Sequence, residues 1–451
     1  MPEPIPFSEP PWLCGHPSPY YNESHIEWQR YCRQFITENL TQYAMQWENE
    51  GQVPEDKYSK FAKANMLIPN LPAPLPKQAL EAVGITTIGP LRVEDFDGIH
   101  QAIYVSEIIR SGLNGPASSL CTGIAYGTPP LLKFADKALQ QRVVSDILSG
   151  KKRICIAISE PDAGSDVANI QTTAKKSADG RDYIVNGSKK WITNGIWSNY
   201  ASMCVRTGGS GANGLSVLLV PLKDQKGVSM RRIPVSGQKC AGTTFIELVV
   251  ILSHHLDRSL ISLPRLDDVE VPVENLVGQE GMGMKYIMTN FNHERLTIAV
   301  KVTTQARVAL ATAFEYCMKR EAFGAPLMNQ PVVRHRLAKA GAQLEAQWAW
   351  VESFVYQMGR LSKEVSDAKL GGLTALAKAQ AGIVLNECSQ CAQLLFGGNG
   401  YTMTGQGELI EKISREVAGA RIPGGSEDVM LDLSVRQLYK NYQRATSKAS
   451  L

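Results

Sequence analysis

The sequence predicts an α+β fold built of three parts in order: a helical domain, a β domain and a helical bundle. The prediction rests on two changes in hydrophobic periodicity. Helical spacing runs from about residue 25 to 150, strand-like runs replace it from Ile154 to about Val277, and helical spacing returns from Gly283. We therefore assign residues 1–24 to a proline-rich arm, 25–152 to an N-terminal helical domain, 153–278 to a middle β-barrel or sandwich domain, and 279–451 to a C-terminal four-helix bundle.

The composition is that of an ordinary globular protein. The 451 residues, 44% hydrophobic and 20% charged, are enough for two or three domains with sizeable cores. A net charge of +4 is too small to predict binding to nucleic acid or an anionic membrane, and no apolar run approaches the length of a membrane span. Nine cysteines without a signal peptide are typical of reduced thiols in an intracellular protein.

The two ends of the chain carry some targeting information. Seven of the first nineteen residues are proline and the first arginine is Arg30, which is unlike an arginine-rich transit peptide. The C-terminal Ala449-Ser450-Leu451 matches a peroxisomal signal only at its ends. We therefore expect an extended N-terminal arm and a cytoplasmic or peroxisomal location rather than a mitochondrial one.

Local signals predict individual elements of the first two domains. Ser24 is a plausible N-cap for the first helix, and Ala102, Val105 and Ile109 form one face of a later one. Asn186-Gly187 lies between two extended runs, which predicts a hairpin turn. Leu215–Val220 is an apolar run ended by Pro221 and predicts a buried strand.

The first helix of the C-terminal part carries a candidate base. A stripe at steps of three and four residues places Glu294 on the apolar face, and its members are Ile287, Phe291, Glu294, Ile298 and Val302. An inward-facing carboxyl has a raised pKa, which suits it to take a proton from a weak carbon acid. The alternative is a structural carboxylate paired with the neighbouring Arg295.

Two further clusters suggest a flat, phosphate-bearing ligand. Ser159-Glu160-Pro161 through Asp166 ends a predicted strand, and Trp191 to Gly195 supplies an indole that can cover a ring face. Arg320 to Gly324 offers a guanidinium for a diphosphate and a phenyl ring for a base, and Gly397-Gly398 leaves room for a close backbone approach. Taken singly, the motifs also fit a turn beside a core tryptophan, a surface arginine and a helix C-cap.

Together these motifs, in this order, resemble the acyl-CoA dehydrogenase family from Arg30 to Tyr439. The resemblance implies the acyl-CoA dehydrogenase-like fold, one FAD per subunit and a homotetramer made of paired dimers. It implies that Ser159 and Thr193 bond the flavin ring, that Trp191 covers it, and that Arg320 and Phe323 hold the diphosphate and adenine across a subunit contact. The remaining residues that it implies are Ile156, Gly397 and Gly398 for the cofactor, and Ser165 and Arg295 for the CoA substrate.

The resemblance also implies a reaction. The family removes the proton α to a thioester and transfers the β-hydrogen to the flavin as hydride. Most members carry their base late in the chain, where this sequence has Gly424. A minority, including the isovaleryl and long-chain branches, carries it at the position of Glu294. We therefore predict that Glu294 is the base and that the backbone N–H of Gly424 serves the developing enolate oxygen.

Three departures from the family pattern stand out. Leu394 replaces a glutamine before the glycine pair, and Pro423 replaces an aromatic residue of the acyl pocket. Leu248 to Leu266 interrupts a strand and is an extra hairpin, a partner contact or the product of a faulty gene model. His254 and His255 within it do not predict a metal site, because neighbours on a strand point to opposite faces, and we expect no metal elsewhere.

Three functions follow from these features. The favoured one is an FAD-dependent acyl-CoA dehydrogenase that passes electrons to electron-transfer flavoprotein or another acceptor. The second is a flavin oxidase of the same fold that acts on an acyl thioester or a secondary metabolite, with oxygen as acceptor. The third is a binder of acyl-CoA or flavin without catalysis. Flavin bleaching separates the third from the first two, and peroxide yield separates the first from the second.

Overall fold

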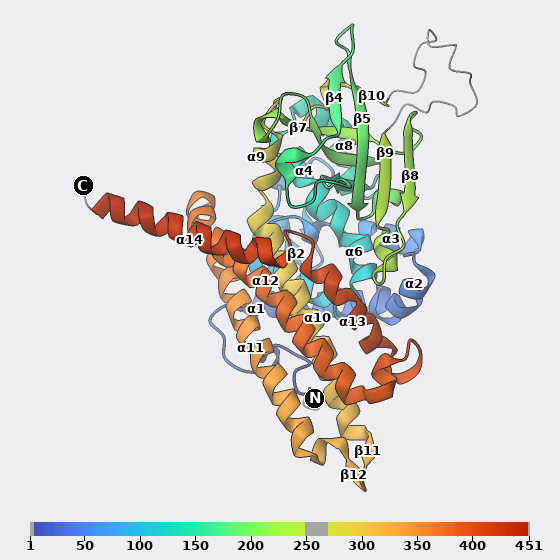
Figure 1. Ribbon diagram of the computed structural model, residues 1–451, viewed down its shortest axis with the longest axis vertical. Coiled ribbons are helices and arrows are strands. Elements are labelled where there is room, and N and C mark those ends of the chain that lie inside the picture. Colours follow the sequence, from blue (N-terminus) through green and yellow to red (C-terminus); the bar gives the residue numbers. More distant parts are fainter. Residues whose placement is uncertain (1–3, 249–268, 450–451) are drawn as a thin grey trace.

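The computed structural model describes residues 4–248 and 269–449. The order of helical domain, sheet and helical domain along the chain confirms the predicted fold class (Figure 1). Among the described residues, none of the helices combines the length and apolarity needed to cross a membrane. Most of the predicted insertion, residues 249–266, lies outside the described part.

The N-terminal domain is a set of helices around a core that contains Trp28, Tyr104 and Phe61, all fully buried. The first helix begins at Glu23, two residues before the start that a Ser24 cap predicts, because the side chain of Asn22 caps it by accepting the N–H of His25 at 3.2 Å. The Ser24 prediction is wrong. The helices are α1 (Glu23–Asn39), α2 (Ala44–Glu50), α3 (Glu55–Lys63), α4 (Lys77–Glu81), α5 (Gly98–Ile108), α6 (Asn114–Thr122), the π-turn η5 (Gly123–Gly127), α7 (Pro129–Phe134) and α8 (Lys137–Leu148), with a small hairpin of β1 (Thr87–Ile88) and β2 (Leu91–Arg92).

The proline-rich arm folds back on the helices instead of extending away. The Glu9 carboxylate pairs with Arg33 and Arg110, both at 2.9 Å, and Trp12 stacks on Tyr21 with ring centroids 4.0 Å apart. Within residues 4–22 the arm forms one short 3-10 turn, η1 (Pro11–Cys14). It covers α5 and α10 (Phe291–Lys319), whose Arg307 donates to the Glu9 carbonyl.

The middle domain is one curled eight-stranded sheet. The strand order is β3-β6-β4-β5-β9-β8, with β10 paired to β5 and β7 paired to β6. The strands are β3 (Ile154–Ala157), β4 (Thr173–Lys176), β5 (Asp182–Ile192), β6 (Tyr200–Arg206), β7 (Leu215–Pro221), β8 (Val228–Arg232), β9 (Thr244–Leu248) and β10 (Val269–Pro272). The predicted buried strand Leu215–Val220 is confirmed, since each of its residues is buried in β7.

The hairpin predicted at Asn186-Gly187 is wrong, because both residues lie inside the continuous strand β5. The first half of β5 pairs with β4 and β10, and its second half pairs with β9. Gly187 has φ +145°, and a Cβ there would lie 2.7 Å from the Cα of Thr172. Gly187 therefore lets β5 pass close to the backbone of Thr172. A glycine inside a strand can serve this purpose, so Asn-Gly does not by itself specify a turn.

The C-terminal domain consists of long helices (Figure 1). They are α9 (Gly283–Met288), α10 (Phe291–Lys319), α11 (Pro331–Arg360), α12 (Lys363–Phe396), α13 (Glu408–Arg421) and α14 (Glu427–Ala449), with the hairpin β11 (Glu321–Ala322) and β12 (Ala325–Pro326) and the turn η12 (Gly397–Tyr401). Helices α10 to α13 pack together, and α14 packs on α12 before leaving the body of the molecule. The predicted stripe is interrupted between Met288 and Phe291, so Ile287 belongs to α9.

Candidate active site

Glu294 lies in the first turn of α10, where its carboxyl is largely but not fully enclosed by protein. Burial raises the pKa of Glu294 to about 7. Oε1 accepts one hydrogen bond, from the Asn290 side chain at 3.0 Å. Within residues 4–248 and 269–449, no ion pair joins Glu294 to Arg295, so the carboxyl is not held in the structural pair that was the alternative to a base.

Arg295 turns away from Glu294 into the protein. It is 5% exposed, its Nη1 lies 3.4 Å from the Asn292 side-chain oxygen, and its guanidinium sits 5.5 Å from the ring centroid of Phe291. Burial lowers its pKa, and Nε has no hydrogen-bond partner in the described chain. Its role in substrate binding stays a prediction.

Gly424 lies in the turn between α13 and α14, packed against the next turn of α10 after Glu294. Its φ is +72°, and a Cβ at this position would lie 2.6 Å from Cδ1 of Ile298. No described residue accepts the Gly424 N–H. A side chain is therefore excluded here by both conformation and space, and the backbone donor is left available.

The carboxylate nearest in sequence to this turn is already engaged. Glu427 pairs with Arg421 at 2.6 Å across the turn, and the hydrogen bond and charge of Arg421 lower the pKa of Glu427. Glu427 is thus held as an ion-paired carboxylate, away from the role of base.

Lys378 of α12 holds the same turn through two hydrogen bonds. The sequence did not predict this role. Its buried ammonium donates to the carbonyls of Arg421 at 3.0 Å and Gly425 at 2.6 Å. Burial lowers its pKa to about 8. These two bonds hold the backbone on either side of Gly424, so Lys378 positions the free N–H.

A second wall faces the Glu294 side of α10 and is formed by α6 and η5. The phenol of Tyr126 lies near the Glu294 carboxyl, and burial followed by that charge raises the pKa of Tyr126. Two turns along α10, Lys301 reaches across and donates to the Ser118 hydroxyl at 2.9 Å. Glu294, Tyr126 and Lys301 are largely enclosed by protein, yet each keeps some accessible surface.

The loop after β3 and the end of β5 bring the predicted flavin-ring residues together. The buried Lys189 ammonium bonds the Ile158 carbonyl at 3.0 Å and the Glu160 carboxylate at 2.8 Å, and the N–H of Lys190 donates to the Ser159 carbonyl at 2.9 Å. These bonds fix Ser159 beside the strand that ends in Trp191.

Trp191 and the hydroxyls beside it are available to a ligand. The indole of Trp191 is 52% exposed, and its φ is +67°, an unusual value for a bulky residue. The hydroxyls of Ser159 and Thr193 are partly accessible, and no described residue is hydrogen-bonded to them. An exposed ring flanked by free hydroxyls fits a flat polar ligand.

One chain of contacts joins this surface to the face of α10 that carries Glu294. The side chain of Asn194, next after Thr193, donates to the carbonyls of Ser118 at 3.0 Å and Ser119 at 3.3 Å. Ser118 in turn accepts from Lys301 of α10. The two predicted parts of the site are therefore neighbours across α6.

Arg320 and Phe323 lie at the other end of α10. Arg320 is 26 positions beyond Glu294, which is about 39 Å along a helix axis, and Phe323 follows three positions later. Phe323 is 94% exposed at the tip of the β11–β12 hairpin, at the bottom of Figure 1. One subunit does not bring these residues to the Trp191 surface.

The glycine pair after α12 lies at the same end as this hairpin. Phe396 stacks on Tyr316 of α10 with centroids 4.0 Å apart, and Gly397 and Gly398 follow directly. A Cβ at either glycine would meet no atom within 4 Å. The backbone is therefore uncovered here, and the cofactor role of the two glycines stays a prediction.

The other predicted residues are placed less informatively. Ile156 lies in β3 and is partly buried, Ser165 is exposed in the loop that follows, and Leu394 is 62% exposed near the end of α12. Gln393, the displaced glutamine, lies 3.5 Å from the Gly400 carbonyl. The predicted roles of these residues stay predictions.

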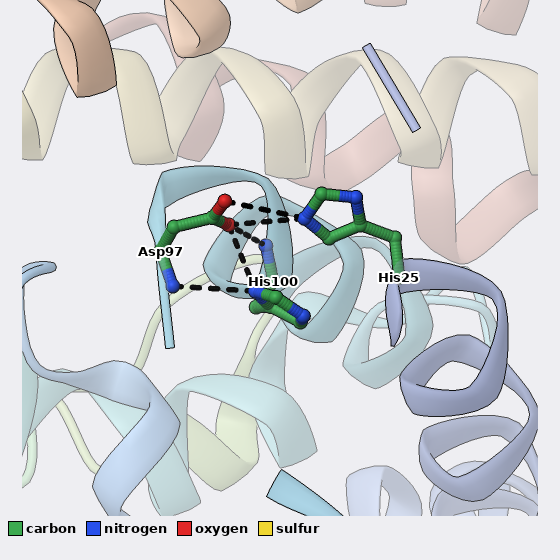
Figure 2. Close-up of side chains that lie close together, drawn as sticks. All are labelled: His25, Asp97 and His100. Atoms are coloured by element: carbon green, nitrogen blue, oxygen red, sulfur yellow. Dashed lines mark hydrogen bonds and ion pairs between the residues drawn. The ribbon is translucent and has the colours of Figure 1, made fainter. Parts of the chain in front are cut away.

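Figure 2 shows a His25, Asp97 and His100 cluster, the one group with metal-like spacing among the described residues. Asp97 caps α5 by accepting the N–H groups of Ile99 and His100, and both imidazoles lie within 3.2 Å of its carboxylate. Nδ1 of His25 accepts the Asn22 N–H, and Nε2 of His100 lies 3.2 Å from the Ser24 hydroxyl. The hydrogen bonds account for this cluster as a link between the starts of α1 and α5.

Sequence reasoning missed Lys301, Ser118, Tyr126 and Lys378. Lys301 carried a usable signal, since it follows Glu294 by seven positions and so lies on the same helix stripe. The other three depend on contacts between segments far apart in the chain, and no local pattern marks them.

Three regions of the chain match the domains of one family. "Acyl-CoA dehydrogenase, N-terminal domain" matches residues 22–151, its middle domain matches 155–249, and its C-terminal domain matches 281–439. The chain is 62% identical over 444 residues to acyl-CoA dehydrogenase apdG of Emericella nidulans, covering 98% of this chain and 97% of that protein.

More distant proteins show the same similarity. The chain is 27% identical over 427 residues to the mitochondrial long-chain specific acyl-CoA dehydrogenase of Mus musculus, covering 93% of this chain and 87% of that protein. The crystal structure of a probable acyl-CoA dehydrogenase from Mycobacterium abscessus is 28% identical with a TM-score of 0.78, covering 93% of this chain and 100% of that one.

Proposed function

Because the chain belongs to the acyl-CoA dehydrogenase family, we propose that it removes one hydrogen each from the α and β carbons of an acyl-CoA thioester, with Glu294 as the base. The resemblance seen in the sequence is confirmed, and the chain is an FAD-dependent oxidoreductase. The observation that carries the proposal is the partly accessible Glu294 carboxyl, with a pKa near 7, one helical turn from the Ile298–Gly424 contact.

The residues present fit FAD. When bound, FAD supplies the two-electron acceptor that takes the β-hydrogen as hydride. The exposed Trp191 indole would cover one face of the ring, and the unpaired hydroxyls of Ser159 and Thr193 would bond its polar edge. The open glycine pair and the exposed Phe323 would take the adenosine diphosphate half.

Glu294 would take the α proton on its free carboxylate oxygen. Oε1 is engaged by Asn290, so Oε2 is the acceptor without a described partner. A base with a pKa near the working pH combines a useful ionised fraction with a useful driving force. Tyr126, opposite Glu294, would help to exclude water from the carboxyl.

The turn at Gly424 would stabilise the enolate that forms when the proton leaves. Its N–H has no described acceptor, and the turn packs on the helix that carries the base. The Lys378 bonds to the Arg421 and Gly425 carbonyls hold this donor in place without reorganisation. A fixed donor aimed at developing charge is the usual source of such stabilisation.

A homotetramer would complete each FAD site. The two sets of FAD residues lie at opposite ends of α10, so the adenosine half would be held by a neighbouring subunit. Large apolar side chains are exposed on the hairpin, in and just after η12, and along α14, as in surfaces that bind other chains: Phe323, Tyr401, Met403, Val435, Tyr439 and Tyr442, each at least 60% exposed. We propose electron-transfer flavoprotein or another protein as the final electron acceptor.

The test is anaerobic mixing of the purified flavoprotein with short, medium, long and branched acyl-CoA thioesters, followed through the visible flavin absorbance. Bleaching by a subset is expected in the wild type but not in Glu294→Gln. Flavin that no thioester reduces would overturn the proposal. Peroxide formed in air at the rate of turnover would point instead to an oxidase, and little peroxide supports a dehydrogenase.

A further inference from the structure

The base-bearing stripe of α10 continues into a buried polar group. Glu294, Ile298 and Lys301 follow one another at steps of four and three residues, so their side chains leave the helix on one face. All three keep accessible surface although α6, η5 and the Gly424 turn surround them. Lys301 therefore lies on the same partly accessible face of α10 as the base, about 10 Å further along the helix axis.

The Lys301 ammonium has spare hydrogen-bonding capacity. In the described chain its one hydrogen bond goes to the Ser118 hydroxyl at 2.9 Å, and no carboxylate lies within ion-pair distance. An ammonium has three N–H donors, so two lack a protein partner. Burial lowers the pKa of Lys301, because a buried ammonium without a counter-charge is costly unless something else satisfies it.

Glu416, the carboxyl that interacts electrostatically with Lys301, does not fill this need. Glu416 accepts from the Asn114 N–H at 3.0 Å and from the Gln305 side chain at 2.5 Å, not from Lys301. Burial raises the pKa of Glu416 to about 8, so it is mostly uncharged at neutral pH. The thiol of Cys121, also near Lys301, is neutral as well, since burial raises its pKa to about 12.

We propose that Lys301, with Ser118, is the polar end of the acyl pocket and selects thioesters whose acyl chain carries an oxygen acceptor near its far end. The acceptor is a carbonyl, hydroxyl or carboxylate oxygen that takes the free N–H donors of Lys301. This inference rests on the proposed function and names its substrate class. An extended chain covers roughly 3.5 Å per three bonds, so a 10 Å separation places the oxygen about eight bonds from the α carbon.

A plain fatty acyl chain would not suit this pocket. A methyl end would displace water from the ammonium and offer nothing in return, which leaves two donors unsatisfied. Hydrogen bonds to a charged group contribute enough to change affinity by about tenfold or more. The pocket should therefore select substrates by the group at the far end of the acyl chain, which is distant from the α and β carbons that react.

The experiment compares acyl-CoAs of about six to ten carbons that end in a methyl group, carry a keto or hydroxyl group next to the end, or end in a carboxylate. The kcat/KM of anaerobic flavin reduction is measured for wild type, Lys301→Met and the control Thr303→Val. Thr303 lies on the opposite face of α10 and bonds only the Ala299 carbonyl of its own helix.

Wild type and Thr303→Val are expected to prefer an oxygenated chain over the methyl-ended chain of equal length by at least about tenfold. Lys301→Met should lose or reverse that preference. Dissociation constants in the Glu294→Gln background, with and without Lys301→Met, give the same comparison without turnover. The arms with keto, hydroxyl and carboxylate ends show which oxygen the pocket accepts.

Two results would overturn the inference while leaving the proposed function intact. One is a wild-type enzyme that reduces its flavin at least as fast with methyl-ended chains, which needs no variant to observe. The other is an equal loss for all chains in Lys301→Met together with a lower unfolding temperature, which would make Lys301 a structural residue. If no thioester of any kind reduced the flavin, the proposed function itself would fail.

Discussion

Replacing Glu294 with glutamine tests the base through pH as well as rate. Glutamine keeps the size of the side chain and can still interact with Asn290, but it cannot accept the α proton. The rate of flavin reduction should fall by about 10²- to 10⁴-fold, the usual contribution of a positioned base. FAD content and acyl-CoA binding should remain, because Glu294 contacts neither the Trp191 surface nor the far hairpin.

The pKa of Glu294 fixes the shape of the pH profile. With a value of about 7, the ionised fraction rises about tenfold between pH 6 and pH 8. The kcat/KM for flavin reduction in the wild type should rise by that factor and then level off, since only the ionised form accepts a proton. Stopped-flow reduction under anaerobic conditions, from about pH 5.5 to 9, measures it.

The same pKa predicts an effect on stability that does not depend on turnover. Folding raises the pKa from 4.5 to about 7, so the folded state favours the neutral carboxyl. Its stabilising effect is complete below pH 4.5 and is lost as the pH rises through 7, by up to about 3 kcal/mol. Glu294→Gln should therefore match the wild type below about pH 4.5 and exceed it in free energy of unfolding near pH 8.

Glu416→Gln is the matched control. Its carboxyl also has a raised pKa, about 8, but it is 2% exposed and bonded to Asn114 and Gln305. This variant should leave the midpoint of the reduction profile near pH 7. A wild-type profile that is flat over this range, or a Glu294→Gln enzyme that reduces its flavin at near the wild-type rate, would remove Glu294 from the role of base.

Three further predictions concern the surroundings of the site. Gly424→Ala should lower the free energy of unfolding by about 1–3 kcal/mol. The loss should be smaller in an Ile298→Ala background, because that change removes the close contact between residue 424 and Cδ1 of Ile298. Equal losses in both backgrounds of the double-mutant cycle would contradict this. Arg320→Ala should lower FAD occupancy more than it slows flavin reduction in the enzyme that retains FAD. The control Lys319→Ala, at an exposed neighbour paired with Glu315, should leave FAD occupancy unchanged. Full FAD occupancy in Arg320→Ala would refute this prediction. Asp97→Ala should lower the free energy of unfolding by about 2 kcal/mol at pH 7. Asp136→Ala, which removes a helix cap with one hydrogen bond, should lower it by about 1 kcal/mol. The Asp97 effect should fade as the pH drops below the ordinary range of aspartate pKa values, because folding lowers the pKa of Asp97.

The sequence was sufficient for the features that depend on local spacing. The order of the three parts followed from periodicity, and Glu294 followed from its place on a stripe, because burial of one helix face needs no knowledge of what lies opposite. The buried strand at Leu215–Val220 followed from an unbroken apolar run. Each of these signals is contained within a few turns or one strand.

The errors arose where distant segments decide the outcome. Asn186-Gly187 has the composition of a hairpin turn, but β5 continues through it because β4, β9 and β10 supply partners on either side. The contact of Lys301 with Ser118 joins positions 183 apart, and Lys378 meets carbonyls more than 40 positions away. Such pairs become visible only when packing brings the elements together.

The Gly424 turn has an evolutionary consequence. A residue with a carboxylate side chain fits position 424 only if the backbone leaves the left-handed region and the Ile298 side chain moves. Either change alone leaves the other obstacle in place. A single substitution would pass through a form with a strained turn and no gain in basicity. The base is therefore expected to stay on α10. Single substitutions can change the residues around Glu294, whereas moving the base to the Gly424 turn requires two changes at once.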